Sequence, residues 1–180
     1  VREIDAMGGI MGWAADKCAI QFKTLNKSKG RAVWSPRAQV DKIKYSAFIK
    51  NKIISDKNIK IINDEVVNIC VDNNKISGCV FASGNKLELD VLIITAGTFL
   101  NGKIHVGDTS YPAGRFGESP SVGMTESLLS LGFVSARLKT GTPPRLLASS
   151  INWDHLDLAP GDEDINCFSI KTKSTSHVPN

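Results

Sequence analysis

The residues with the clearest potential for chemistry lie in the stretch 91–100, which reads V-L-I-I-T-A-G-T-F-L. Residues 91–95 are apolar or β-branched without alternation, which is typical of a strand buried on both faces of a parallel sheet. Gly97 and Thr98 follow the end of this strand, where small residues let a ligand approach the backbone. The stretch therefore predicts a site for a nucleotide-type cofactor. The alternative is an ordinary buried strand with a glycine turn.

Two groups of basic residues could bind an anion. Arg115, Lys139 and Arg145 lie in loops rich in Gly and Pro, and such loops beside the carboxyl ends of parallel strands often hold ligands. The other group surrounds Trp34 and consists of Lys23, Lys27, Lys29, Arg31 and Arg37. Cations beside an aromatic ring suit phosphate contact and base stacking. Composition alone favours the plainer alternative for this second group, which is a solvated basic face.

Other kinds of catalytic site find no support in the sequence. The three histidines lie far apart, no serine stands in G-x-S-x-G, and the four cysteines form neither a C-x-x-C pair nor a zinc spacing. We therefore predict no catalytic residue and no metal site within the chain. The cysteines are expected to be free thiols, as in a cytoplasmic protein. The acidic run Asp162–Asp164 is expected to be a solvated surface loop.

Composition narrows the class of protein further. The formal net charge of +4 is compatible with a nucleic-acid partner but does not require one. The longest apolar runs are far shorter than the roughly 20 residues of a membrane span, so no membrane partner is expected.

The order of predicted elements indicates an α/β fold. Two short helices separated by Gly8 and Gly9 should precede a strand at 20–25 and a helix from about Pro36 to Ile53. Later strands are expected at 59–62, 66–71, 75–82, 86–89 and 133–138, with a short helix at 125–131. A helix, an antiparallel meander and a return to a parallel strand is the order found in flavin-binding Rossmann variants. We therefore predict a Rossmann-like FAD/NAD(P)-binding domain with an inserted β meander at about 57–90 and a Gly/Pro-rich loop region at about 101–150.

Several long motifs resemble the MnmG (GidA) family. They are V-R-E-I-D-A-M-G-G at 1–9, G-T-F-L-N-G-K-I-H-V-G at 97–107 and R-L-K-T-G-T-P-P-R at 137–145, with shorter matches at 21–22, 26–30 and 37–41. The likeness covers essentially all 180 residues. It implies an FAD-dependent enzyme that adds an aminomethyl-type group to carbon 5 of the wobble uridine of tRNA. The implied co-substrates are NADH and methylene-tetrahydrofolate, and the implied partners are tRNA, the GTPase MnmE and a second copy of the full-length chain.

The resemblance also implies which residues meet the cofactor. Val66 would meet the FAD adenosine through its backbone, Gly97 and Thr98 would face the cofactor, and Ser121 would contact the flavin. The family's G-x-G-x-x-G loop and its two catalytic cysteines would fall outside the chain. Residues 1–180 would then be a partial FAD-binding domain without its first βα unit, inactive by itself. The start without Met and the end without a helix stop also predict an internal piece of a longer protein.

Two alternative functions remain open from the sequence. One is a related folate- and FAD-dependent tRNA uridine methyltransferase. The other is a non-catalytic tRNA-binding module that keeps the basic loops without the flavin.

Overall fold

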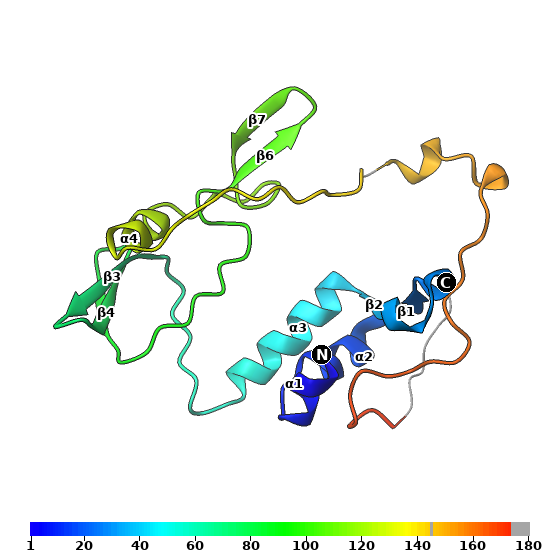
Figure 1. The fold of residues 1–180 in the computed structure, drawn as a ribbon, viewed down its shortest axis with the longest axis horizontal. Coiled ribbons are helices and arrows are strands. Elements are labelled where there is room, and N and C mark those ends of the chain that lie inside the picture. Colours follow the sequence, from blue (N-terminus) through cyan, green and yellow to red (C-terminus); the bar gives the residue numbers. More distant parts are fainter. Residues whose placement is uncertain (145, 174–180) are drawn as a thin grey trace. The chain divides into compact units, whose positions relative to one another are not determined.

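The computed structural model describes residues 1–144 and 146–173, which form short helices and small antiparallel sheets (Figure 1). The α-helices are α1 (Arg2–Ala6), α2 (Met11–Cys18), α3 (Lys42–Ile54) and α4 (Met124–Ser130). The strands are β1 (Ala19–Leu25), β2 (Ser35–Val40), β3 (Val66–Asp72), β4 (Lys75–Phe81), β5 (Lys86–Glu88), β6 (Lys103–Val106) and β7 (Thr109–Pro112). None of the helices in this described part combines the length and the hydrophobicity that crossing a membrane requires.

The predicted pair of short helices at the start of the chain is confirmed. The break between α1 and α2 depends on Gly9, because a Cβ there would lie 2.8 Å from the backbone oxygen of Ile4. Trp13 of α2 then meets Phe48 of α3 edge to face, with ring centroids 5.1 Å apart. The ammonium group of Lys52 lies 4.7 Å from the centre of the Trp13 ring. These contacts hold α2 against α3.

Strands β1 and β2 form an antiparallel hairpin in which Lys23 pairs with Arg37. The helix predicted to run to about Ile53 forms as α3, but its predicted start near Pro36 was wrong, because residues 35–40 find backbone partners in β1. Helix α3 begins only at Lys42. Its start is set by Asp41, whose Oδ1 accepts hydrogen bonds from the backbone N–H groups of Ile43 at 2.9 Å and Lys44 at 3.0 Å. Such an N-cap satisfies amides that have no partner within the helix.

The predicted antiparallel meander is confirmed in strands β3, β4 and β5, which pair in that order. Its first turn contains Asn73 and Asn74 with φ angles of 49° and 60°, the left-handed conformation that a two-residue hairpin turn needs. The strand expected at 59–62 does not form. Helix α4 covers the sheet near β3, where the backbone N–H of Ile69 donates a 2.9 Å hydrogen bond to Ser127 Oγ.

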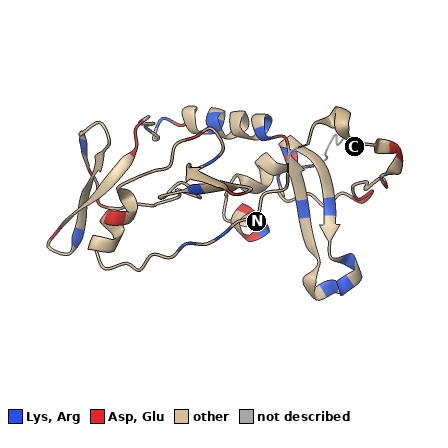
Figure 2. Cartoon of the chain, turned by 90° about the horizontal axis from the view of Figure 1, so that it is seen from above, with Lys and Arg blue, Asp and Glu red and all other residues tan. Residues whose placement is uncertain are grey.

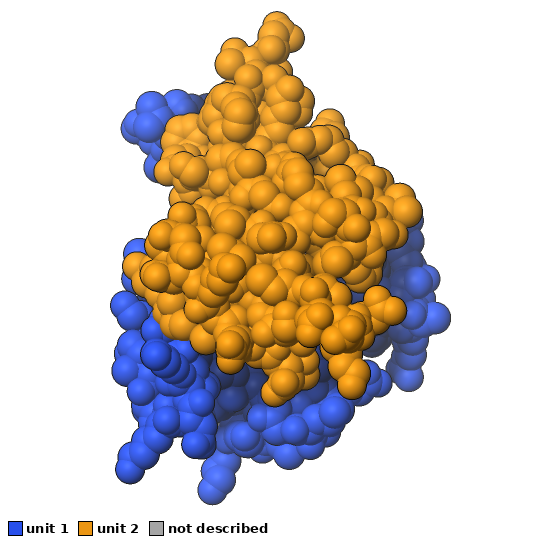
Figure 3. All heavy atoms as spheres, turned by 90° about the vertical axis from the view of Figure 1, so that its left-hand side faces the viewer, with its two compact units in different colours: residues 1–61, 145–180 blue, residues 62–144 orange. Residues whose placement is uncertain are grey.

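The chain divides into two compact units (Figure 3). The first contains Val1–Ile61 and the part of the chain from residue 145 onward, and the second contains Ile62–Pro144. In the first unit the buried carboxylates of Asp5 and Asp16 hold the returning chain. Asp16 accepts hydrogen bonds from the backbone N–H groups of Phe168 and Ser169 at 2.8 and 2.9 Å, and Asp5 accepts one from Ile170 at 2.9 Å.

The predicted buried strand at 91–95 is not formed. Val91 and Ile93 are 74% and 80% exposed, and no described residue pairs with this stretch. A strand forms when its backbone groups find partners on a neighbouring strand, and the sheets of the described residues are antiparallel. Within residues 1–144 and 146–173 there is therefore no parallel sheet, and the one parallel contact that the structure records there is an isolated bridge between Leu100 and Ser121. The strand expected at 133–138 is also missing.

Candidate functional site

In the second unit, residues 96–102 and 113–126 form one hydrogen-bonded group, which we call the turn–loop assembly. The backbone N–H of Ser121 donates to the carbonyl of Phe99 at 2.8 Å, and the N–H of Asn101 donates to the carbonyl of Ser121 at 2.8 Å. These bonds join a turn and a loop that are about twenty residues apart in the sequence. The assembly follows directly after the stretch that the sequence singled out for a cofactor.

Glycines allow the backbones in the turn–loop assembly to approach closely. The hydroxyl of Thr98 donates a 2.9 Å hydrogen bond to the carbonyl of Gly114. A Cβ on Gly102 would lie 2.5 Å from the carbonyl oxygen of Ala113 and 2.6 Å from that of Thr98, and a Cβ on Gly114 would collide with the ring of Phe99. Since real side-chain carbons do not come this close to backbone atoms, the packing requires glycine at position 102. At position 114 a Cβ would require the Phe99 ring to move.

Glu126 connects the turn at 96–102 to the loop at 113–126 through hydrogen bonds. Its Oε1 accepts a 2.7 Å hydrogen bond from Asn101 Nδ2, and its Oε2 accepts a 3.0 Å hydrogen bond from the backbone N–H of Gly123. The bond from Asn101, followed by backbone bonds, lowers the pKa of Glu126 below its ordinary value. The carboxylate is therefore ionised at neutral pH and can accept both hydrogen bonds. Asn101 and Glu126 are not among the residues predicted from the sequence, although a Glu three residues after Gly123 is an N-terminal helix signal.

The start of β3 lies against the same assembly. Glu65 Oε1 accepts a 3.2 Å hydrogen bond from the backbone N–H of Val122. A Cβ on Gly123 would lie 2.9 Å from the carbonyl oxygen of Val67. Val66 stands between the two contacting residues and is half-buried. The structure thus brings Val66 close to the loop that carries Ser121.

The predicted cofactor residues have groups that remain available to a ligand. Gly97 has a φ of +59°, and no other atom lies within 4 Å of the place its Cβ would occupy. Thr98 beside it is exposed. The hydroxyl of Ser121 has no hydrogen-bond partner among the described residues. An open backbone turn and nearby hydroxyl groups fit the polar contacts that the adenosine and flavin parts of FAD can make.

Of the basic residues predicted in the Gly/Pro-rich loops, the structure describes Arg115 and Lys139. Arg115 donates to Glu118 Oε2 from Nη2 at 2.8 Å and from Nε at 3.1 Å, and its guanidinium lies 5.2 Å from the centre of the Phe99 ring. Lys139 is exposed, and Arg145 lies outside the described residues. Arg137, which was not proposed as a site residue, donates a 2.9 Å hydrogen bond to the carbonyl of Asn101.

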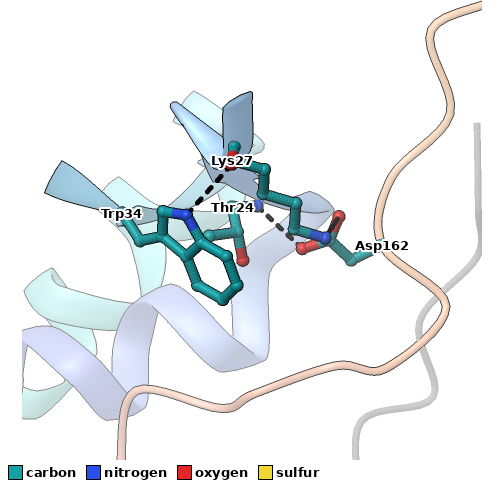
Figure 4. A network of polar contacts seen from close by, with 4 residues as sticks. All are labelled: Thr24, Lys27, Trp34 and Asp162. Atoms are coloured by element: carbon teal, nitrogen blue, oxygen red, sulfur yellow. Dashed lines mark hydrogen bonds and ion pairs between the residues drawn. The ribbon is translucent and has the colours of Figure 1, made fainter. Parts of the chain in front are cut away.

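In the first unit, Asp162 joins the returning chain to the β1–β2 hairpin (Figure 4). Its Oδ2 accepts a 2.8 Å hydrogen bond from the backbone N–H of Thr24, and its Oδ1 lies 2.8 Å from Lys27 Nζ. The hydrogen bonds from Lys27 and Thr24 lower the pKa of Asp162 to about 2. Because its side chain is only 17% exposed, the prediction of a solvated loop was wrong at this residue.

The cysteines are free thiols, as expected. Burial raises the pKa of the Cys18 and Cys79 thiols, which makes them poor nucleophiles. Throughout residues 1–144 and 146–173, no group of three or more His, Cys, Asp or Glu side chains could hold a metal ion.

Comparisons with known proteins agree on one family. The family model described as "Glucose inhibited division protein A" matches residues 1–179. Two relatives are named "tRNA uridine 5-carboxymethylaminomethyl modification enzyme MnmG". The protein from Campylobacter hominis is 46% identical to this chain over 96% of the chain's length, and the protein from Chlorobium phaeobacteroides is 45% identical over 98%. The chain spans 27% and 28% of those two relatives. The solved structure of Aquifex aeolicus GidA superposes with a TM-score of 0.88 at 41% identity, covering 99% of this chain and 31% of that one.

Proposed function

Because the chain belongs to the glucose inhibited division protein A family, we propose that it forms part of an FAD-dependent enzyme that modifies the wobble uridine of tRNA. The observation that carries this proposal is the likeness, over almost the whole chain, to relatives named as tRNA uridine 5-carboxymethylaminomethyl modification enzymes. Since the chain spans about 28% of those relatives, the activity belongs to the full-length protein.

FAD is the cofactor that we propose for the full-length protein, and residues 1–180 would form part of its binding domain. Val66 would contact the adenosine through its backbone, Gly97 and Thr98 would form the turn that faces the cofactor, and Ser121 would donate or accept a hydrogen bond at the flavin. The bound cofactor supplies the redox chemistry. The turn–loop assembly supports this proposal because it holds Thr98 and Ser121 in fixed positions while leaving the backbone of Gly97 open.

The remaining elements of the FAD-binding domain would come from other parts of the full-length protein. These include the first βα unit, with the glycine-rich loop that holds the pyrophosphate at a helix N-terminus. In that context the exposed stretch 91–95 would become a buried strand between parallel neighbours. This arrangement would cover its apolar side chains and satisfy its backbone.

The proposed reaction needs further substrates and partners. NADH would reduce the flavin, methylene-tetrahydrofolate would supply the carbon, and the GTPase MnmE would act with the enzyme, which we propose to be a homodimer in the cytoplasm. Arg115, Lys139 and Arg145 would contact tRNA or the edge of the flavin. The support for Lys139 is its exposure. The guanidinium of Arg115 is already paired with Glu118 and would have to exchange that partner for the ligand.

The test begins with the colour of the purified full-length protein. We expect absorbance near ~450 nm from oxidised flavin and incorporation of the modification into an unmodified tRNA transcript when all substrates are present. A colourless protein that binds tRNA would contradict the proposal and favour the non-catalytic binding module.

The proposed role of Ser121 can be tested separately. Ser121→Ala removes one hydrogen bond to the cofactor and should weaken FAD affinity by about 5- to 10-fold, as measured by fluorescence titration of the apoprotein. Ser110→Ala, on the exposed β6–β7 hairpin, is the control and should leave FAD affinity unchanged. Equal affinities of the two variants would show that the Ser121 hydroxyl does not contact FAD.

A further inference from the structure

The β1–β2 hairpin, residues 19–40, is a basic segment of the chain without acidic residues. This segment contains five of the 22 Lys and Arg residues and none of the 18 Asp and Glu residues. The other residues therefore carry a net charge of −1, compared with +4 for the whole chain. Figure 2 shows the basic residues along both strands of the hairpin and at its end. A hairpin with this charge attracts polyanions.

The end of this hairpin, residues 26–34, which we call the hairpin tip, keeps cations that no acidic group neutralises. Lys27 forms an ion pair with Asp162 at 2.8 Å, and the carboxylate neutralises its charge. Lys29 and Arg31 are exposed, and no ion pair to either is formed within the described chain. Two unpaired cations two residues apart can contact neighbouring phosphates.

An aromatic ring stands beside these cations in a fixed orientation. Trp34 is 41% exposed, although its Nε1 donates a 3.2 Å hydrogen bond to the carbonyl of Lys27 (Figure 4). The guanidinium carbon of Arg31 lies 5.7 Å from the centre of the ring. The bond to Lys27 orients the indole without burying it. Such a ring can stack with a nucleobase.

We propose that the hairpin tip is a contact surface for unpaired RNA, with Trp34 stacking on a base and with Lys29 and Arg31 contacting the adjacent phosphates. This inference rests on the proposed function, which makes tRNA the substrate, and it adds the residues of the hairpin tip to the contacts with that substrate. A base within a duplex is stacked on its neighbours and does not offer its face to a side chain. The exposed ring therefore favours nucleotides of a loop over a double-stranded stem.

The first experiment measures binding of an unmodified tRNA transcript to the full-length protein. Trp34→Leu should weaken the affinity about 10-fold, because stacking of one base is lost, whereas Trp34→Phe keeps a ring and should lose less than about 3-fold. The matched control is Trp153→Leu. Trp153 is also exposed, at 62%, and its Nε1 also donates to a backbone carbonyl, but no Lys or Arg flanks it in the sequence between residues 146 and 170.

The second experiment measures the salt dependence of the same binding. Replacing both Lys29 and Arg31 with Ala should reduce the slope of log K against log salt by about 1.4, since each lost contact with single-stranded phosphate accounts for about 0.7. The double variant Lys57→Ala and Lys60→Ala removes two exposed cations outside the hairpin and should leave the slope unchanged. A blunt RNA duplex of similar length should be bound equally by wild-type protein and Trp34→Leu.

Two results would overturn this inference while leaving the proposed function intact. One is a protein that modifies tRNA and whose hairpin-tip variants bind it within about 2-fold of wild type with an unchanged salt slope. The other is an equal loss of affinity for the duplex and for tRNA in Trp34→Leu, which would exclude stacking on an unpaired base. Failure of the wild-type protein to bind tRNA at all would refute the proposed function together with this inference.

Discussion

Gly102 illustrates how the absence of a single carbon atom shapes the candidate site. The turn at 96–102 and the loop beyond Pro112 approach one another through backbone atoms on both sides of this residue. Backbone oxygens cannot rotate away as flexible side chains do. The close packing of the site therefore depends on a position that has no side chain of its own.

Gly102→Ala should destabilise the full-length protein by about 1–3 kcal/mol, because overpacking forces the backbone to shift. Urea unfolding measures this loss. Gly141→Ala is the control, since nothing lies within 4 Å of the Cβ that it would add, and it should stay within about 0.5 kcal/mol of wild type. Equal stability of the two variants would mean that the turn and the loop are not packed as described.

Asp162 gives the first unit a dependence on pH. Its pKa is lowered to about 2 in the folded chain, whereas an unfolded Asp titrates near ~3.9. The stability that it contributes is thus fully present above pH ~4 and is lost as the pH falls toward ~2. We expect the difference in unfolding free energy between wild type and Asp162→Asn to be constant above pH ~5 and to shrink between pH ~4 and ~2. A difference that stays constant down to pH ~2 would refute the assigned role of this carboxylate.

At the scale of the elements, the border between β2 and α3 shows competition between local and non-local preferences. Pro36 near a helical pattern predicts an early helix start. The pairing of β2 with β1 and the cap formed by Asp41 move that start to Lys42. A proline fits here because β2 is an edge strand of a two-stranded sheet, so its missing N–H costs little.

Asp41→Ala should therefore destabilise α3 and cost about 1 kcal/mol of unfolding free energy. Asp41→Ser retains a side-chain acceptor at the N-cap and should stay within a few tenths of a kcal/mol of wild type, roughly within the error of thermal unfolding. If Asp41→Ser were as unstable as Asp41→Ala, the hydrogen bonds to Ile43 and Lys44 would not be the cause.

At the scale of the whole molecule, the apolar stretch 91–95 pairs with no strand among the described residues. Val91 and Ile93 expose most of their surface to solvent, which is uncommon for large apolar residues close together in one segment. In the proposed domain, the full-length protein provides the strands on either side.

Hydrogen exchange of the full-length protein tests this arrangement. We expect slow exchange of the amides at 91–95, because a central strand opens only with its domain. In a polypeptide limited to residues 1–180, the same amides should exchange freely, while β3 and β4 provide the protected reference in both. Rapid exchange of 91–95 in the full-length protein would argue against a parallel sheet at this position.

Local patterns were sufficient to predict many of the elements. The glycines near residue 8, the Asn73-Asn74 turn and Gly132 after α4 act through their immediate backbone geometry. The helix pair, the meander and α4 could therefore be found from the sequence. The long motifs likewise identified the family, because identity over many ordered residues does not depend on knowing the fold.

Contacts between distant residues could not be inferred from such patterns. Asn101 meets Glu126, Thr24 meets Asp162, and Asp16 meets the backbone at Phe168 only after the chain has folded back on itself. The strand predicted at 91–95 failed for the same reason. Apolar β-branched residues favour a strand, but hydrogen-bonded neighbours are needed to form one, and those neighbours are a property of the assembled fold.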